Sequence, residues 1–159
     1  MKTLITGACG FVGQHLLKLL IDNKCSQADG GPAAGRHDGQ EHFLGIDLRQ
    51  TGEESINIFP GSTRILLDTL KSTAIQDKVS FKFEYLQADL TDKKRVDEVI
   101  SFFKPDRIYH LAAQASVKYS WANPVETFQT NVFGGIYLLE AMKKYCPDCK
   151  MLIVCTAEV

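Results

Sequence analysis

Residues 6–13 read TGACGFVG, and this short segment determines how the rest of the chain is interpreted. Its glycines, Gly7, Gly10 and Gly13, follow a short apolar run over residues 2–6 and precede a helical pattern of apolar residues. A strand, a glycine turn and a helix in this order are typical of a dinucleotide-binding site. Glycine lets the backbone approach a pyrophosphate closely, and the helix N-terminus presents N–H groups and the positive end of its dipole to the anion. The segment therefore predicts a dinucleotide site.

Length and charge narrow the class of protein. A chain of 159 residues suits one domain with its own hydrophobic core. Its 18 basic and 19 acidic residues are balanced, so charge gives no indication of a nucleic acid or a membrane surface as partner. No apolar run approaches the roughly 20 residues that cross a bilayer, and Gln14, His15 and Lys18 interrupt the apolar core that a signal peptide needs. We therefore expect a cytoplasmic protein that binds neither nucleic acid nor membrane.

The cysteines predict no disulfide framework, because there are five of them, an odd number. Cys146 and Cys149 form a lone Cys-x-x-Cys motif. A structural zinc site needs a second pair of ligands, and a redox-active pair gains its low pKa at the head of a helix. The motif has neither feature, so we expect a solvent-facing turn and no metal site.

Strand and helix patterns alternate along the chain. Strands are predicted at residues 2–6, 42–47, 79–87, 107–112 and 151–156, and helices at residues 11–22, 63–72, 92–103 and 124–145. Strict alternation predicts an α/β fold with a parallel sheet and right-handed crossovers. We expect a doubly wound Rossmann domain with strand order 3-2-1-4-5 that ends after its fifth strand.

The apolar patterns also predict the place of each strand in the sheet. Residues 4–5 and 152–155 are continuously apolar, as strands covered on both faces are. Apolar and polar residues alternate from Val79 to Tyr85, which suits an edge strand protected by its charges. The strand order 3-2-1-4-5 places this third strand at the edge, so the two predictions agree.

Three local features need their own interpretation. Residues 24–41 are rich in glycine and are expected to form a flexible surface insertion, at the end of the sheet remote from the ligand crevice. Gly134 and Gly135 lie inside a predicted helix, where each costs about 1 kcal/mol relative to alanine. We therefore expect another backbone or a ligand close to them. His110, at the end of a buried strand, is expected to be a core histidine rather than an acid or base.

Each strand ends in a distinctive group, at the sheet edge where open α/β folds bind ligands. The first strand leads into the glycine loop, the second into Asp47, the third into residues 89–90, the fourth into residues 111–114 and the fifth into residues 156–158. Asp47 can accept hydrogen bonds from the adenosine ribose and would repel a 2′-phosphate, which favours NAD over NADP. Arg49 leaves this choice open, because a guanidinium binds phosphate well.

These motifs resemble those of the extended short-chain dehydrogenase/reductase family, and more narrowly its nucleotide-sugar epimerases and dehydratases. The resemblance covers the whole chain except residues 24–41. It implies that Phe11 and Val12 lie against the pyrophosphate, that residues 89–90 contact the adenine, that residues 111–113 line the central portion of the cofactor, and that Asn131 supports the active site. The motifs and the resemblance together assign these cofactor-binding residues: Gly7, Gly10, Phe11, Val12, Gly13, Asp47, Arg49, Asp89, Leu90, Leu111, Ala112, Ala113, Gln114 and Asn131.

Thr156 and Glu158 carry the catalytic prediction. By the resemblance, Thr156 occupies the catalytic Ser/Thr position and hydrogen-bonds the sugar hydroxyl that is oxidised. The Thr-x-Glu pattern looks most like that of 4,6-dehydratases, such as those acting on GDP-mannose. In that chemistry NAD takes a hydride from sugar C4, a carboxylate removes the C5 proton while hydroxide leaves C6, and the hydride returns to C6. Glu158 is placed for the carboxylate role.

Several departures from the family pattern keep alternatives open. Ala157 stands where dTDP-glucose dehydratases have an acid and GDP-mannose dehydratases a serine, and a 4-epimerase, decarboxylase or reductase would share the first oxidation step. No tyrosine is followed by a lysine four residues later, so the family's Tyr-x-x-x-Lys pair is missing. The sugar-binding lobe that follows this pair in the family is missing too.

We therefore expect the cofactor-binding portion of a longer enzyme, inactive alone, homodimeric when full length and with an apolar edge exposed at its fifth strand. The sequence identifies neither the sugar nor the nucleotide base of the substrate. A non-catalytic NAD-binding protein that ends at Val159 is the alternative from another class.

Overall fold

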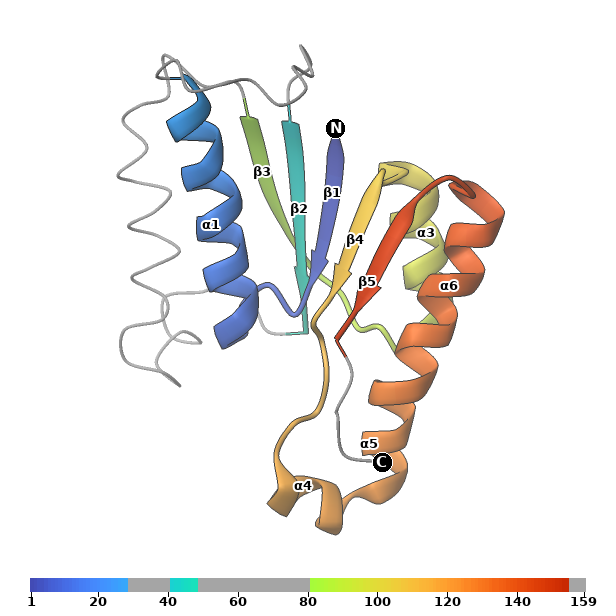
Figure 1. Cartoon of the computed structure of the whole chain (residues 1–159). Helices are drawn as coiled ribbons and strands as arrows, with labels where there is room; N and C mark the ends of the chain where they lie inside the picture. The colour runs from blue at the N-terminus through green and yellow to red at the C-terminus, as the bar shows by residue number, and fades with distance from the viewer. Residues whose placement is uncertain (29–40, 49–80, 155–159) are drawn as a thin grey trace.

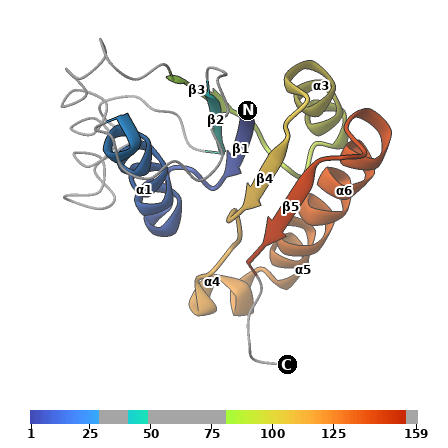
Figure 2. The same cartoon turned by 45° about the horizontal axis from the view of Figure 1, so that its top comes forward.

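The computed structural model describes residues 1–28, 41–48 and 81–154, and the side chains of residues 1–20, 41–48 and 84–154. Five parallel strands form one sheet with the order β3-β2-β1-β4-β5. α1 lies on one face of the sheet, and α3 and α6 lie on the other (Figures 1 and 2). The predicted Rossmann order is therefore confirmed.

The elements follow one another in the predicted alternation. Their bounds are β1 (Lys2–Thr6), α1 (Phe11–Ala28), β2 (Glu41–Asp47), β3 (Phe81–Gln87), α3 (Lys93–Phe103), β4 (Arg107–His110), α4 (Val117–Ala122), α5 (Pro124–Phe128), η1 (Gln129–Phe133), α6 (Gly134–Tyr145) and β5 (Lys150–Ile153). The helix predicted at residues 63–72 lies outside the described residues. The helix predicted at residues 124–145 is confirmed in its extent, but a π-helical turn, η1, interrupts it between α5 and α6.

The first helix is longer than the sequence predicts. α1 ends at Ala28 rather than at residue 22, so the first residues of the predicted insertion 24–41 continue the helix. Residues 23–29 contain no glycine or proline, the residues that most often end a helix, and the first of these is Gly30. Glu41, at the other end of the segment, already belongs to β2. The prediction for residues 29–40 concerns residues outside the described part of the chain.

α3 shows how the sequence pattern becomes packing. One face of the helix carries apolar side chains at helical spacing, and these are buried: Val96, Val99, Ile100 and Phe103. Phe102, on the other side of the helix, is exposed. Asp92 caps the helix, because its carboxylate accepts a hydrogen bond from the backbone N–H of Arg95 at 3.1 Å. Together with α6, this helix covers the main core, to which β1, β2 and β4 contribute buried aliphatic side chains. A second, smaller core on the other face joins α1 to β1 and β2.

The two edges of the sheet differ from each other. β3 forms one edge, as predicted, and its Glu84 pairs with His42 on β2 at 2.5 Å. β5 forms the other edge, where Leu152 and Val154 are 55% and 57% exposed. The prediction that residues 152–154 are covered on both faces is therefore wrong, since β5 is the last strand of the sheet and has only β4 beside it. The prediction of an exposed apolar edge at the fifth strand is confirmed.

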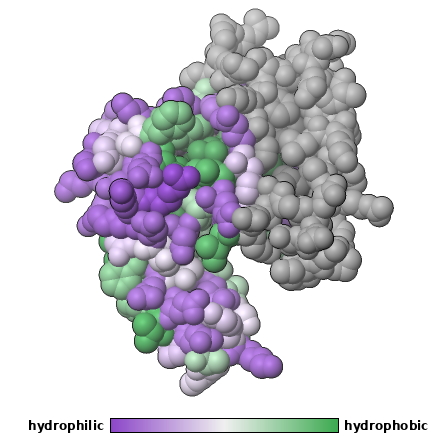
Figure 3. Space-filling view, turned by 180° about the vertical axis from the view of Figure 1, so that it is seen from behind, coloured by the Kyte–Doolittle hydropathy of each residue, from purple (hydrophilic) through white to green (hydrophobic). Residues whose placement is uncertain are grey.

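α4 is a helix that the sequence patterns did not predict. Ser116 begins it, with its hydroxyl accepting from the N–H of Tyr119 at 3.4 Å. α4 and α5 extend beyond the carboxyl edge of the sheet (Figure 1) and expose apolar side chains, among them Trp121 and Val125. Seen from behind, apolar and hydrophilic residues are interspersed over the surface of the described part of the chain (Figure 3).

Candidate functional site

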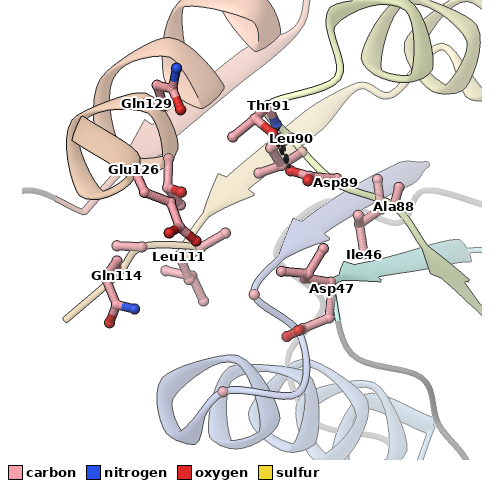
Figure 4. Close-up of a pocket in the computed structure, with 16 residues that line it drawn as sticks. Ile46, Asp47, Ala88, Asp89, Leu90, Thr91, Leu111, Gln114, Glu126 and Gln129 are labelled. Atoms are coloured by element: carbon pink, nitrogen blue, oxygen red, sulfur yellow. Dashed lines mark hydrogen bonds between the residues drawn. The ribbon is translucent and has the colours of Figure 1, made fainter. Parts of the chain in front are cut away.

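A cavity of about 400 Å³ opens at the carboxyl edge of the sheet, where open α/β folds bind ligands. The glycine loop, the ends of β2, β3 and β4, and the helical segment α5–η1 contribute its walls (Figure 4). Its lining residues are Gly7, Gly10, Ile46, Asp47, Leu48, Ala88, Asp89, Leu90, Thr91, Leu111, Ala112, Ala113, Gln114, Glu126, Gln129 and Thr130. Segments far apart in the sequence therefore meet at the place that the strand ends predicted.

The glycine loop is held in a conformation that excludes side chains. Gly7 has a φ of 70°, in the left-handed region, and a Cβ there would lie 2.7 Å from the backbone nitrogen of Ala112. A Cβ on Gly13 would collide with the carbonyl oxygen of Gly7. The loop that follows β1 thus lies directly against the backbone after β4 at Gly7, and neither Gly7 nor Gly13 has room for a side chain.

Asp47 lies at the end of β2, beside the glycine loop (Figure 4). Its side chain is buried, and its Oδ2 accepts a hydrogen bond from the backbone N–H of Cys9 at 3.1 Å. The N–H groups of Gly7 and Ala8 donate to the carbonyl of Ile46, at 2.8 and 3.2 Å. Backbone and side chain together therefore fix this carboxylate relative to the loop.

Asp89 and Leu90, which follow β3, line the opposite part of the cavity, and the adenine contact predicted for them stays a prediction. The Oδ1 atom of Asp89 accepts from both the backbone N–H and the hydroxyl of Thr91, each at 2.8 Å, which orients the carboxylate in a tight turn. Leu90 is buried against α6, where a Cβ on Gly134 would lie 3.3 Å from the Leu90 Cβ.

Side chains, rather than the expected backbone or ligand, come nearest to Gly134 and Gly135, and only Gly134 is closely approached. A Cβ on Gly135 would lie 3.7 Å from the Nε2 atom of His110. His110 is buried, and a hydrogen bond of 2.7 Å joins its Nδ1 atom to the Thr6 hydroxyl oxygen. Burial lowers the pKa of His110, so the neutral imidazole is favoured. The prediction of a core histidine is confirmed.

Four predicted cofactor residues in the described part of the chain do not line the cavity. Phe11 and Val12, in the first turn of α1, are 74% and 55% exposed, and Gly13 is buried behind the loop. Asn131 acts at one remove, because its Oδ1 accepts from the N–H of Gln114 at 2.7 Å and its Nδ2 donates to the carbonyl of Gln114 at 3.1 Å. This pair of hydrogen bonds fastens the segment after β4 to η1, while the role of Asn131 in supporting the active site stays a prediction.

The sequence did not indicate several lining residues, of which Glu126 is the most polar. Its Oε2 accepts a hydrogen bond from the hydroxyl of Tyr119 on α4 at 2.7 Å, and this bond raises the pKa of Tyr119. Glu126 lies on the side of the cavity formed by Leu111 and Gln114, across from Asp47 (Figure 4). The other lining residues that were missed are Ile46, Leu48, Ala88, Thr91, Gln129 and Thr130.

Arg49, Thr156 and Glu158 lie outside the described residues, so their roles stay predictions. In the described part of the chain, no group of three or more His, Cys, Asp and Glu side chains is arranged to hold a metal ion. Nor is any helix there long and apolar enough to cross a membrane.

The Cys-x-x-Cys motif forms a turn, as predicted, in which the N–H of Cys149 donates to the carbonyl of Cys146 at 3.0 Å. The turn faces solvent, as predicted, through the exposed Pro147 and Asp148, whereas the side chains of Cys146 and Cys149 are half-buried against the main core. Burial, the largest cause, raises the pKa of the Cys149 thiol to about 12. Such a thiol is a poor nucleophile at neutral pH.

Comparison with known proteins agrees with this geometry. Residues 42–159 match the family model described as GDP-mannose 4,6 dehydratase. The chain belongs to the extended short-chain dehydrogenase/reductase family of nucleotide-sugar epimerases and dehydratases.

Members of this family with different reactions are similar to the chain. It is 28% identical to the CDP-paratose 2-epimerase of Salmonella typhi over 100% of its own length and 38% of that protein. It is 29% identical to the dTDP-glucose 4,6-dehydratase of Escherichia coli over 91% of its length and 32% of that protein. The UDP-glucose 4-epimerase of Thermus thermophilus, solved in complex with NAD, is 30% identical with a TM-score of 0.56, over 91% of the chain and 34% of the epimerase. The chain thus spans about a third of the length of these relatives.

Proposed function

We propose that this chain is the NAD-binding portion of a nucleotide-sugar 4,6-dehydratase that oxidises sugar C4 before water is eliminated across C5 and C6. The observation that carries the proposal is the cavity at the carboxyl edge of the sheet. It gathers most of the predicted cofactor residues: Gly7, Gly10, Asp47, Asp89, Leu90, Leu111, Ala112, Ala113 and Gln114.

The residues that are present fit a dinucleotide. The cavity volume of about 400 Å³ falls within the range of small-molecule sites. Gly7, Gly10 and the start of α1 offer a close backbone approach and a helix N-terminus to the pyrophosphate. The buried carboxylate of Asp47, at the end of β2, suits the adenosine ribose hydroxyls.

The charge of the cavity favours NAD over NADP. Its lining residues include three acids, Asp47, Asp89 and Glu126, and no lysine or arginine among the residues that the structure describes there. A 2′-phosphate would add negative charge beside Asp47, which is unfavourable. The NAD complex of the related Thermus thermophilus epimerase supports the same cofactor.

NAD bound in this cavity would supply the hydride-transfer chemistry of the proposed reaction. Asn131 holds the segment after β4 through its two hydrogen bonds to Gln114, and so keeps that wall of the cofactor site in place. The Thr156 hydroxyl hydrogen-bonds the hydroxyl group of the sugar. The Glu158 carboxylate removes the proton from C5, which the neighbouring ketone has made acidic. His110 takes no part, because it is a neutral core residue engaged with Thr6.

A nucleotide-sugar epimerase is the second candidate. Two of the three relatives compared above are epimerases, and epimerases, decarboxylases and reductases of the family share the first oxidation step. A non-catalytic NAD-binding protein would use the same cavity but no sugar nucleotide. The cytoplasmic location and the homodimer of the whole protein stay predictions.

Glu158→Gln in the whole protein separates these reactions. In deuterated water, the dehydratase proposal predicts exchange at sugar C5 that the variant loses by about 100-fold or more, because a positioned general base contributes that much. Asp148→Asn, which removes an exposed turn carboxylate, is the matched control and should leave the exchange unchanged. Undiminished C5 exchange in Glu158→Gln would contradict the dehydratase assignment, whereas a C4 epimer as sole product would identify an epimerase.

A further inference from the structure

Gln14 is a polar residue in an apolar position behind the glycine loop. It lies in the first turns of α1, three residues before the fully buried Leu17, and its own side chain is only 4% exposed. Its Nε2 donates to the carbonyl oxygen of Cys9 at 2.8 Å. Its Oε1 is buried and has no hydrogen-bond partner in the described part of the chain. A buried acceptor without a partner costs about 1–3 kcal/mol, so the amide does not serve stability well.

The Cys9 backbone connects Gln14 to the cofactor site. The carbonyl of Cys9 accepts from Gln14, while the N–H of the same residue donates to the Oδ2 atom of Asp47 at 3.1 Å. Both peptide planes of Cys9 are thereby fixed from opposite sides. Gln14 does not line the cavity itself. The Cys9 backbone is therefore the hydrogen-bonded connection between the Gln14 amide and Asp47.

We propose that Gln14 is a positioning residue that orients the Asp47 carboxylate, through the Cys9 backbone, for discrimination between NAD and NADP. The inference rests on the proposed function, in which NAD binds in this cavity. With the Gln14 amide in place, the Cys9 N–H holds Asp47 where it accepts from the ribose hydroxyls and repels a 2′-phosphate. Without it, the Cys9 carbonyl is free to rotate and the carboxylate loses a fixed donor.

Gln14→Met tests the inference, because methionine keeps the length of the side chain but removes both the donor and the orphaned acceptor. We expect the ratio of the dissociation constants for NADP and NAD to fall by about 3- to 10-fold, the value of one hydrogen bond. The melting temperature without cofactor should not fall, since the unpartnered oxygen is gone as well. Lys18→Met, one turn further along α1 and exposed, is the matched control and should change neither quantity. Gln14→Leu repeats the test should the methionine variant not fold.

A second arm shows whether the effect passes through Asp47. Asp47→Asn alone should reduce the preference for NAD, and adding Gln14→Met to it should produce no further change. If Gln14→Met left the ratio of the dissociation constants for NADP and NAD unchanged, the inference would be overturned. The same holds if Gln14→Met lowered this ratio as much in the Asp47→Asn protein as in the unsubstituted protein. Equal weakening of both cofactors together with a lower melting temperature would indicate a structural role instead. Failure of the unsubstituted protein to bind NAD at all would contradict the proposed function itself.

Discussion

β1 and β5 have the same apolar character in the sequence but opposite surroundings in the structure. Leu4 and Ile5 of β1 are fully buried between α1 on one face of the sheet and α3 and α6 on the other. Leu152 and Ile153 of β5 are 55% and 38% exposed at the edge. An apolar run therefore predicts that a segment forms a strand, whereas the strand order decides whether that strand is covered.

The segments that follow these two strands differ in the same way. β1 continues into the glycine loop, which is fastened to its neighbours by the hydrogen bond from Gly7 N–H to Ile46 and by that from Leu111 N–H to Thr6. β5 leads toward Thr156 and Glu158, which lie outside the described residues. The proposed cofactor site thus depends on contacts of the β1 side, while the proposed catalytic roles depend on the resemblance to the family.

Replacing the same residue type in both strands should give the largest contrast. Leu4→Ala removes a fully buried side chain and should lower the free energy of unfolding by about 2–5 kcal/mol. Urea unfolding followed by circular dichroism measures the change. A loss below about 1 kcal/mol would mean that β1 is not the centre of the core.

Gly7→Ala is expected to have the next largest effect. The left-handed backbone at this position costs a residue with a Cβ about 1–3 kcal/mol, and the added Cβ would press on the backbone of Ala112. Calorimetric titration with NAD should show binding lost or greatly weakened, along with a lower melting temperature. Ala8→Gly, which removes a Cβ from the same loop, is the control for a merely altered loop and should retain NAD binding. Unimpaired binding by Gly7→Ala would contradict the close fit of the loop.

His110 should make the stability of the β1 side depend on pH. Burial lowers its pKa below the value of 6.5 that it regains on unfolding. Below about pH 6.5 the unfolded state therefore binds the proton more readily, so stability falls as the pH falls and is unaffected above that value. The contribution of one group is at most about 1.4 kcal/mol per pH unit. His110→Gln should reduce this slope between pH 5 and 6.5, while His15→Gln, on exposed α1 surface, should not; equal slopes in all three proteins would refute the argument.

The smallest effect is expected on the β5 side. Leu152→Ala shortens a side chain that is more than half exposed, so the free energy of unfolding should change by no more than about 0.5–1 kcal/mol. The same urea experiment that tests Leu4→Ala measures it. A loss as large as that of Leu4→Ala would show that β5 is covered in solution and would remove the contrast between the two strands.

The sequence was sufficient for the order of the strands and for many of the residues that line the cavity. Glycine spacing, alternation and the residues at the strand ends are local signals, and right-handed crossovers bring those ends to one edge. The buried face of α3 followed from helical periodicity in the same way.

The features that the sequence did not predict are either a helix too short to show a pattern or residues whose place depends on tertiary packing. α4 has only six residues, too few for a helical period to stand out. Glu126 lines the cavity only because α5 lies beyond the carboxyl edge of the sheet, and no local pattern encodes that position. The partial burial of the Cys146 and Cys149 side chains likewise follows from how the end of α6 and the start of β5 pack on the core.

Hydrogen exchange of the protein with and without NAD tests whether NAD binds in the cavity at the carboxyl edge of the sheet. Adding NAD should slow amide exchange in peptides that contain the glycine loop, Asp47, residues 89–90 and residues 111–114, with little change in residues 150–154. Absence of any protection by NAD, or protection confined to peptides away from the cavity, would contradict NAD binding there.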